Sequence, residues 1–121
     1  GFFDYSTLKK TKPETIFINI ARGELSPLAD LVRLLTENEI GGVGIDVYEE
    51  EGRLAHQLRT GQEDSGSREL RLFKQLSRFS NVITTPHNGF NTREAVARKA
   101  EHSARQIAYL LQTNTFLWPV P

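Results

Sequence analysis

Four ionisable side chains stand at or near the ends of apolar segments: Arg22, Asp46, Glu51 and His87. An arginine can bind a carboxylate through paired hydrogen bonds and can polarise a neighbouring ketone. A histidine can deliver a proton to an oxygen at neutral pH, and a nearby carboxylate orients the imidazole and favours its charged form. Together, these groups are what the reduction of a 2-oxo acid needs as hydride reaches the carbon.

Each of these residues also has a plainer interpretation. Arg22 could be an exposed arginine beside a turn, since arginine is mostly exposed. The acidic run 49–51 is, taken alone, typical of a solvated surface, and His87 could be an ordinary loop histidine. Asp46 is harder to explain in this way, because burying a carboxylate is costly unless it is paired or hydrogen-bonded. No zinc-type spacing of histidine and cysteine is present, so we expect no metal site.

Three short strands are predicted to position these residues. The run 16–21 (IFINIA) is apolar, rich in isoleucine and bounded by Pro13 and Gly23, which is typical of a strand buried on both faces of a parallel sheet. Residues 43–48 and 81–85 have the same character. Strands that alternate with helices predict a parallel sheet with right-handed crossovers, and ligands bind at the carboxyl ends of such strands.

Helices are predicted on either side of the first strand. Residues 5–12 suit a short helix with Ser6 as its N-cap. Ser26 is predicted to cap a second helix that has Pro27 at its first position and ends near Asn38, because apolar residues recur there with helical spacing.

The second half of the chain is predicted to carry two more helices. Residues 53–67 are a loop by composition, with a helical turn at 53–59. Residues 68–79 resume the helical pattern, and Asn91 or Thr92 is expected to cap a long final helix. A narrow stripe of small and apolar residues on this last helix suits close packing against another element, and the apolar tail is expected to dock.

Composition excludes several classes of function. The chain has 121 residues, of which 38% are hydrophobic and 25% charged, as in an ordinary globular domain. Fifteen basic residues balance fifteen acidic ones, so we expect no nucleic-acid or membrane partner. The absence of cysteine excludes a disulfide scaffold and is compatible with a cytoplasmic protein. The chain contains no methionine, and we expect it to be a fragment of a longer protein.

Three motifs carry a family resemblance: Asn19–Gly23 (NIARG), Gly44–Tyr48 (GIDVY) followed by Glu51, and Thr85–Gly89 (TPHNG). They resemble, in order, the carboxyl-half motifs of the NAD-dependent D-isomer-specific 2-hydroxyacid dehydrogenases. Each one falls at the end of a predicted strand, and the resemblance extends over nearly the whole chain. The fold that it implies is α/β, the second half of a doubly wound, Rossmann-like parallel sheet with flanking helices.

The resemblance also implies roles for particular residues. Arg22, Glu51 and His87 would form the catalytic triad, with His87 as the acid/base, and Asp46 would face the nicotinamide end of the cofactor. Contacts to NAD would come from six residues: Ile20, Ala21, Arg22, Asp46, His87 and Gly89. Glu49 and Glu50 leave open which carboxylate reaches His87. The glycine-rich dinucleotide fingerprint is absent from this sequence, so NADP also remains open as the cofactor.

In family terms, residues 1–112 would be the carboxyl half of the NAD-binding domain, including the return helix 91–112. Residues 113–121 would begin the segment that returns to a substrate domain. The expected partner is a small 2-oxo or 2-hydroxy acid, and the parent enzyme would be a homodimer, with the fragment inactive alone. Two other interpretations stay open. One is a cofactor-sensing protein similar to the transcriptional co-repressors that resemble these enzymes, and the other is an inactive half-domain.

Overall fold

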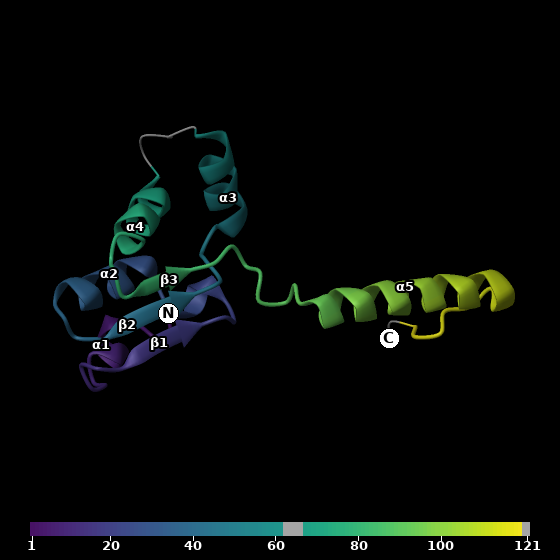
Figure 1. Ribbon diagram of the computed structural model, residues 1–121, viewed down its shortest axis with the longest axis horizontal. Helices are drawn as coiled ribbons and strands as arrows, with labels where there is room; N and C mark the ends of the chain where they lie inside the picture. The colour runs from purple at the N-terminus through teal and green to yellow at the C-terminus, as the bar shows by residue number, and fades with distance from the viewer. Residues whose placement is uncertain (62–66, 120–121) are drawn as a thin grey trace. The chain divides into compact units, whose positions relative to one another are not determined.

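The computed structural model describes residues 1–61 and 67–119 (Figure 1). Residues 62–66, near the end of the predicted polar loop 53–67, lie outside the described residues. The chain divides into two compact units, Gly1–Asn88 and Gly89–Pro121, and each is described by itself.

A three-stranded parallel sheet organises the first unit. Its strands are β1 (Ile16–Asn19), β2 (Gly42–Ile45) and β3 (Val82–Thr84), in the spatial order β1-β2-β3. Ile18 lies opposite Gly44, and Ile45 lies opposite Thr84. The predicted α/β fold with a parallel sheet is confirmed, and the three strands end at one common edge of the sheet (Figure 1).

The strands are shorter than predicted, and the side chain of Asn19 explains where β1 stops. The Asn19 amide accepts a hydrogen bond from the Ala21 backbone N–H (3.0 Å) and donates to the Arg22 carbonyl (2.8 Å). These contacts turn the chain directly after Asn19, so the strand ends two residues before the predicted end. Asp46 likewise lies one residue beyond β2 and not inside it.

The prediction that the first strand is buried on both faces is wrong for this structure. Ile16 and Ile18 are 68% and 66% exposed, whereas Phe17 and Asn19, on the opposite face, are turned towards the helices. Ile83 on β3 is exposed as well. Helices of the first unit therefore cover one face of this sheet, and side chains alternate between the covered and uncovered faces as the pleat requires.

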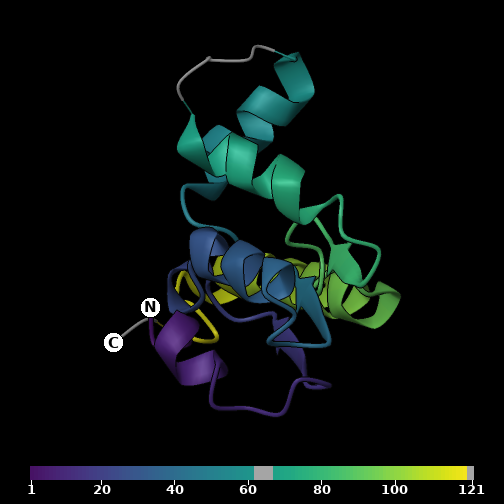
Figure 2. The same ribbon diagram turned by 90° about the vertical axis from the view of Figure 1, so that its left-hand side faces the viewer.

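The described residues of the first unit also form four α-helices and one 3₁₀ helix: α1 (Tyr5–Leu8), η1 (Gly23–Leu25), α2 (Leu28–Thr36), α3 (Glu51–Thr60) and α4 (Arg68–Leu76). Helices α2 and α4 pack against each other, and α3 contacts α4 (Figure 2). Leu31 and Leu34 of α2 and Leu76 of α4 are completely buried. They join Val43 and Ile45 of β2 in one hydrophobic core beneath the sheet.

Two predicted helix caps are wrong. Asp4, not Ser6, caps α1, because its carboxylate accepts a hydrogen bond from the Thr7 backbone N–H (2.8 Å). The helix itself has a single turn instead of extending to residue 12. Pro27 is the N-cap of α2, since the Ser26 hydroxyl is engaged by the Asn19 amide at 2.7 Å. Asp4 thus takes the capping role from Ser6, whereas Ser26 is bound by a side chain seven residues away in the sequence.

The segment predicted as a loop with one helical turn is instead the helix α3. It has ten residues, and Leu54 and Gln57 are buried. The helix ends at Gly61, whose left-handed backbone (φ 64°) is typical of a C-cap glycine. Few of its residues are apolar, so the helical period is weak in the sequence. The following helix, α4, is capped by Ser67 and ends at Leu76, three residues before its predicted end.

The second unit consists of the helix α5 (Arg93–Thr113) and the tail that follows it. Thr92 is the N-cap, as one of the two predicted alternatives, and accepts a hydrogen bond from the Ala95 backbone N–H (3.1 Å). The tail folds back on α5, because the Gln106 side chain accepts hydrogen bonds from the backbone N–H groups of Leu117 (2.9 Å) and Trp118 (3.2 Å). The predicted docking of the tail is thus confirmed. Within the described parts of the chain, no helix is both long and apolar enough to cross a bilayer.

Candidate functional site

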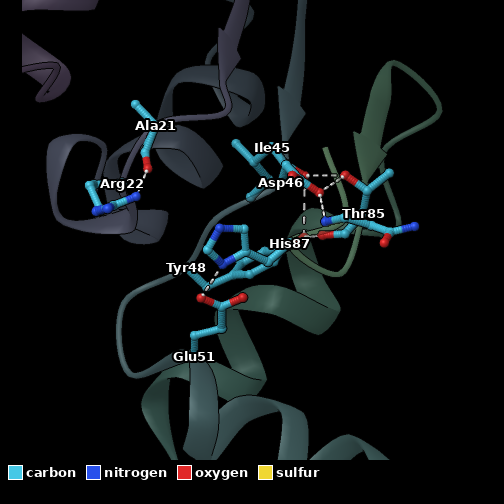
Figure 3. A network of polar contacts seen from close by, with 9 residues as sticks. Ala21, Arg22, Ile45, Asp46, Tyr48, Glu51, Thr85 and His87 are labelled. Atoms are coloured by element: carbon cyan, nitrogen blue, oxygen red, sulfur yellow. Dashed lines mark hydrogen bonds and ion pairs between the residues drawn. The ribbon is translucent and has the colours of Figure 1, made fainter. Parts of the chain in front are cut away.

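The side chains of Glu51 and His87 lie within ion-pair distance of each other at the carboxyl edge of the sheet. His87 Nδ1 lies 2.8 Å from Glu51 Oε2, and both side chains are partly exposed (Figure 3). Glu51 is the first residue of α3, and His87 follows β3. Glu50 pairs instead with Arg53 (3.3 Å), so Glu51 is the carboxylate that reaches the imidazole. Because a carboxylate accepts, Nδ1 must carry a proton in this contact.

The backbone at this pair is held in a conformation that non-glycine residues seldom adopt. His87 has φ 51°, and Glu50, directly before Glu51, has φ 48°. A non-glycine residue in this left-handed conformation costs on the order of 1–3 kcal/mol of stability, and the conformation persists only where surrounding contacts hold it. They are found preferentially at functional sites, so the strain on both sides of the pair supports its choice as the candidate site.

Asp46 is one of the contacts that hold the His87 segment. It is 5% exposed, and its Oδ1 accepts hydrogen bonds from the Thr85 hydroxyl and from the Asn88 backbone N–H (2.8 Å). These bonds offset the cost of burying the carboxylate. They also fasten the chain on both sides of His87 to the residue that follows β2 (Figure 3).

Tyr48 is a second such contact, and it is the functional candidate that sequence reasoning missed. Its phenol donates to the Thr85 carbonyl (2.8 Å), and its ring meets Phe73 edge-on at 5.5 Å. Burial raises the pKa of Tyr48 to about 12, and the nearby Asp46 carboxylate adds to the effect. The signal in the sequence was a tyrosine at the end of an apolar strand, because a buried phenol usually requires a hydrogen-bond partner.

Arg22 lies on the neighbouring loop of the same edge. Its guanidinium donates to the carbonyl of its own neighbour, Ala21 (2.8 Å), and the side chain is exposed (Figure 3). The structure therefore brings Glu51 and His87 into contact and places Arg22 near the β1 end. None of the hydrogen bonds and ion pairs drawn in Figure 3 joins Arg22 to the pair.

Gly23 fixes the backbone of the Arg22 loop. A Cβ atom at this position would lie 2.1 Å from the carbonyl carbon of Tyr48 and 2.4 Å from the nitrogen of Glu49. Only glycine allows this close approach, so the loop after β1 abuts the segment after β2. Of the other residues predicted to contact a cofactor, Ile20 and Ala21 are exposed beside this loop, and Gly89 begins the second unit.

An apolar pocket of about 170 Å³ lies next to Glu51. Leu54 and Leu58 of α3, Phe73 of α4 and Pro86 are among the residues that line it. Across residues 1–61 and 67–119, no three histidine, aspartate or glutamate side chains are grouped closely enough to hold a metal ion.

Comparison with known proteins relates this edge to a protein family. Residues 1–89 match the family model described as D-isomer specific 2-hydroxyacid dehydrogenase, NAD binding domain. A D-lactate dehydrogenase of Streptococcus pyogenes serotype M1 is 34% identical over 113 residues, which cover 93% of this chain and 33% of the relative. A glyoxylate reductase of Pyrococcus furiosus is 35% identical over 100 residues, covering 83% of this chain and 24% of the relative. The chain thus spans about a third or less of the length of these relatives.

Solved structures show the same similarity. A D-isomer specific 2-hydroxyacid dehydrogenase from Lactobacillus delbrueckii ssp. bulgaricus, in its NAD-complexed form, superposes with a TM-score of 0.76 at 29% identity, over 92% of this chain and 33% of that one. A D-2-hydroxyisocaproate dehydrogenase gives a TM-score of 0.79 at 25% identity, over 98% of this chain and 34% of that one.

Proposed function

The chain belongs to the D-isomer specific 2-hydroxyacid dehydrogenase family, within its NAD-binding domain, and from this premise we propose the activity of the parent protein. The parent transfers a hydride between NAD and a small D-2-hydroxy acid or 2-oxo acid. The observation that carries the proposal is the contact of 2.8 Å between His87 Nδ1 and Glu51 Oε2 at the carboxyl edge of the sheet. Ligands bind at this edge in open parallel sheets.

The residues of this edge fit a dinucleotide. Exposed chain at Ile20–Arg22 and the buried carboxylate of Asp46 stand side by side where β1 and β2 end. When bound, NAD supplies or accepts the hydride. Ile20, Ala21, Arg22, Asp46, His87 and Gly89 are the proposed contacts, and NADP remains the alternative cofactor.

His87 is the proposed acid/base. Glu51 holds the proton on Nδ1, so Nε2 is the nitrogen that gives a proton to the substrate oxygen as a 2-oxo acid is reduced. In the reverse direction, Nε2 takes the proton of the hydroxyl group. Glu51 stabilises the imidazolium state that the reduction starts from.

Arg22 is the proposed anchor for the substrate carboxylate. Its guanidinium is exposed and bonded only to a neighbouring backbone carbonyl among the interactions described, so it can rotate to a ligand without breaking a buried ion pair. A guanidinium matches a carboxylate with two parallel hydrogen bonds. The same contact would place the ketone oxygen next to the positive charge.

We further propose the arrangement of the parent chain. Residues 1–112 form the carboxyl half of the cofactor domain with its return helix, and residues 113–121 begin the segment leading to a substrate domain. The parent is proposed to be a homodimer in the cytoplasm.

The first test uses the full-length protein with NADH and a small 2-oxo acid such as pyruvate. Replacing His87→Gln should lower kcat by about 10²–10⁴-fold, the usual contribution of a positioned acid/base. The matched control is His56→Gln, on the exposed surface of α3. Equal activity of both variants would show that His87 is not the acid/base. A wild-type protein that reduces no small 2-oxo acid with either NADH or NADPH would contradict the proposed reaction.

A second test distinguishes Glu51 from Glu50 as the carboxylate that acts on His87. Glu51→Gln removes the charge that stabilises the imidazolium, so the pH above which 2-oxo-acid reduction declines should move downward. Glu50→Gln, which removes the partner of Arg53 and not of His87, should leave this pH unchanged. A shift in the Glu50 variant alone would mean that the wrong carboxylate has been assigned.

A further inference from the structure

Tyr48 stands where the three pieces of the proposed site meet. Its backbone lies against Gly23, where a Cβ atom would come within 2.1 Å of the Tyr48 carbonyl carbon. Its side chain donates to the carbonyl of Thr85 (2.8 Å), two residues before His87. Its own chain continues to Glu51 three residues later. Tyr48 therefore contacts the segments that carry Arg22 and His87, and its own segment carries Glu51 (Figure 3).

The hydrogen bond to Thr85 is well placed to control His87. The Thr85 backbone N–H donates to the Ile45 carbonyl (2.9 Å), so Tyr48 and Ile45 hold both polar atoms of the Thr85 backbone. Only Pro86 separates Thr85 from His87, and the proline ring fixes its own φ angle. With few rotatable bonds between the anchor and the imidazole, a displacement of the Thr85 carbonyl is passed on to His87.

The Tyr48 hydroxyl lies within hydrogen-bond distance of two carbonyls, Thr85 at 2.8 Å and Ile45 at 3.3 Å, and the shorter contact is the one to Thr85. The Tyr48 ring is buried, and Phe73 meets it edge-on at 5.5 Å. A carbonyl only accepts, so the phenol must donate. The charged groups that face the phenol are Asp46 and Glu51, and burial with these carboxylates raises the pKa of Tyr48 to about 12. The phenol therefore keeps its proton across the neutral range.

We propose that Tyr48 is a positioning residue, whose hydrogen bond to the Thr85 carbonyl sets the placement of His87 against Glu51. This inference rests on the proposed acid/base role of His87. It adds a residue that touches no reacting atom but decides how often the imidazole occupies its working position. Loss of the bond should lower kcat and leave KM for the 2-oxo acid nearly unchanged, because the Arg22 side chain makes no described contact with Tyr48.

The test compares two tyrosines in the full-length protein. Tyr48→Phe keeps the ring and removes the donor. Tyr5→Phe removes a phenol that is bonded to Glu37 on the exposed surface of the first unit, and serves as the matched control. With NADH and pyruvate, we expect kcat of the Tyr48 variant to fall by about tenfold, less than for loss of the acid itself. The pH above which reduction declines should move downward, because a displaced imidazole is less stabilised by Glu51.

A spectroscopic readout makes the proposal independent of turnover. The proton on His87 Nδ1, bound to the Glu51 carboxylate, should give a downfield proton NMR signal in the wild-type protein. That signal should shift or broaden in Tyr48→Phe and stay in place in Tyr5→Phe. If the wild-type protein reduces no 2-oxo acid, the proposed function fails, and this signal alone decides whether Tyr48 positions His87.

Unchanged kcat, pH profile and NMR signal in Tyr48→Phe would overturn the inference. If phenylalanine at this position prevents folding, Tyr48→4-aminophenylalanine decides, because it keeps the ring and restores an N–H donor at the same place. Wild-type kcat and pH profile in that variant would support the proposal. A folded variant that stays impaired, although its donor is restored, would overturn it.

Discussion

Residues 1–88 hold together through contacts between segments that are far apart in the sequence, whereas residues 89–121 hold together within one helix and its tail. In the first unit, Leu34 and Leu76 belong to one core, and Tyr48 bonds Thr85. In the second unit, no described residue of α5 is buried, and Gln106 holds a tail only eleven residues away. Polar side chains are held in fixed positions where segments distant in the sequence pack together. The candidate site lies in the unit that has such packing.

The largest expected effect tests whether only the first unit has a core. Leu34 is 0% exposed and Leu111 is 81% exposed. Leu34→Ala should lower the free energy of unfolding by about 2–5 kcal/mol, because it removes buried groups and leaves a cavity. Leu111→Ala should change it by less than about 0.5 kcal/mol. Chemical denaturation of both variants measures the difference, and similar losses would mean that α5 also packs against a core.

The next effect tests the close approach between the loops after β1 and β2. Gly23→Ala would push a methyl group into the Tyr48 carbonyl, so we expect a loss of about 3 kcal/mol in the free energy of unfolding. Gly52→Ala is the control, since no atom lies within 4 Å of its Cβ position and it sits inside α3. Alanine should stabilise that helix by about 0.5–1 kcal/mol. Equal effects at both positions would rule out the close contact.

A smaller effect should appear at high pH and only in the first unit. Burial raises the pKa of Tyr48 to about 12, above its value of roughly 10 in an unfolded chain. A raised pKa contributes stability that is complete below about pH 10 and is lost as the pH rises towards about 12. Urea unfolding as a function of pH should show this decline, and Tyr48→Phe should flatten it. An unchanged decline in the variant would assign it to other groups.

The smallest effect concerns the second unit. Gln106→Ala removes the acceptor of two tail N–H groups and should cost about 1 kcal/mol locally. Trp118 is the only tryptophan and lies 5.1 Å from the His102 ring, so its fluorescence reports the tail. We expect the emission to change while the unfolding midpoint of the first unit stays constant. A coupled change in both would mean that the units are not independent.

Much of the fold follows from sequence patterns of short range. The alternation of apolar runs and helical periods predicted three parallel strands. The polar residues after these strands predicted a site at one edge of the sheet, but Glu51 was chosen over Glu49 and Glu50 only through the family resemblance. Residue type and position are enough to predict a shared edge, because parallel strands present their carboxyl ends together.

What the sequence did not predict depends on side chains that compete across distance. The Asn19 amide turns the chain at the end of β1 and donates a hydrogen bond to the Ser26 hydroxyl. Strand and capping propensities of single residues cannot predict these contacts. Helix α3 has too few apolar residues for its period to stand out. The proposed role of Tyr48 depends on a carbonyl 37 residues away, which only the folded chain brings near.

The contact at Gly23 has a consequence for the rate at which Arg22 can respond to a ligand. The Gly23 backbone packs directly against the Tyr48–Glu49 peptide. A substrate therefore cannot move the loop that carries Arg22 without also moving the segment that leads to Glu51. If Arg22 binds a carboxylate as proposed, it must do so by rotation of its exposed side chain, which leaves only the Ala21 carbonyl. Exposed side chains change rotamer within picoseconds to nanoseconds, whereas lids and loops that gate turnover move in microseconds to milliseconds. Reorientation of the Arg22 guanidinium is therefore expected to be faster than a loop movement of this kind.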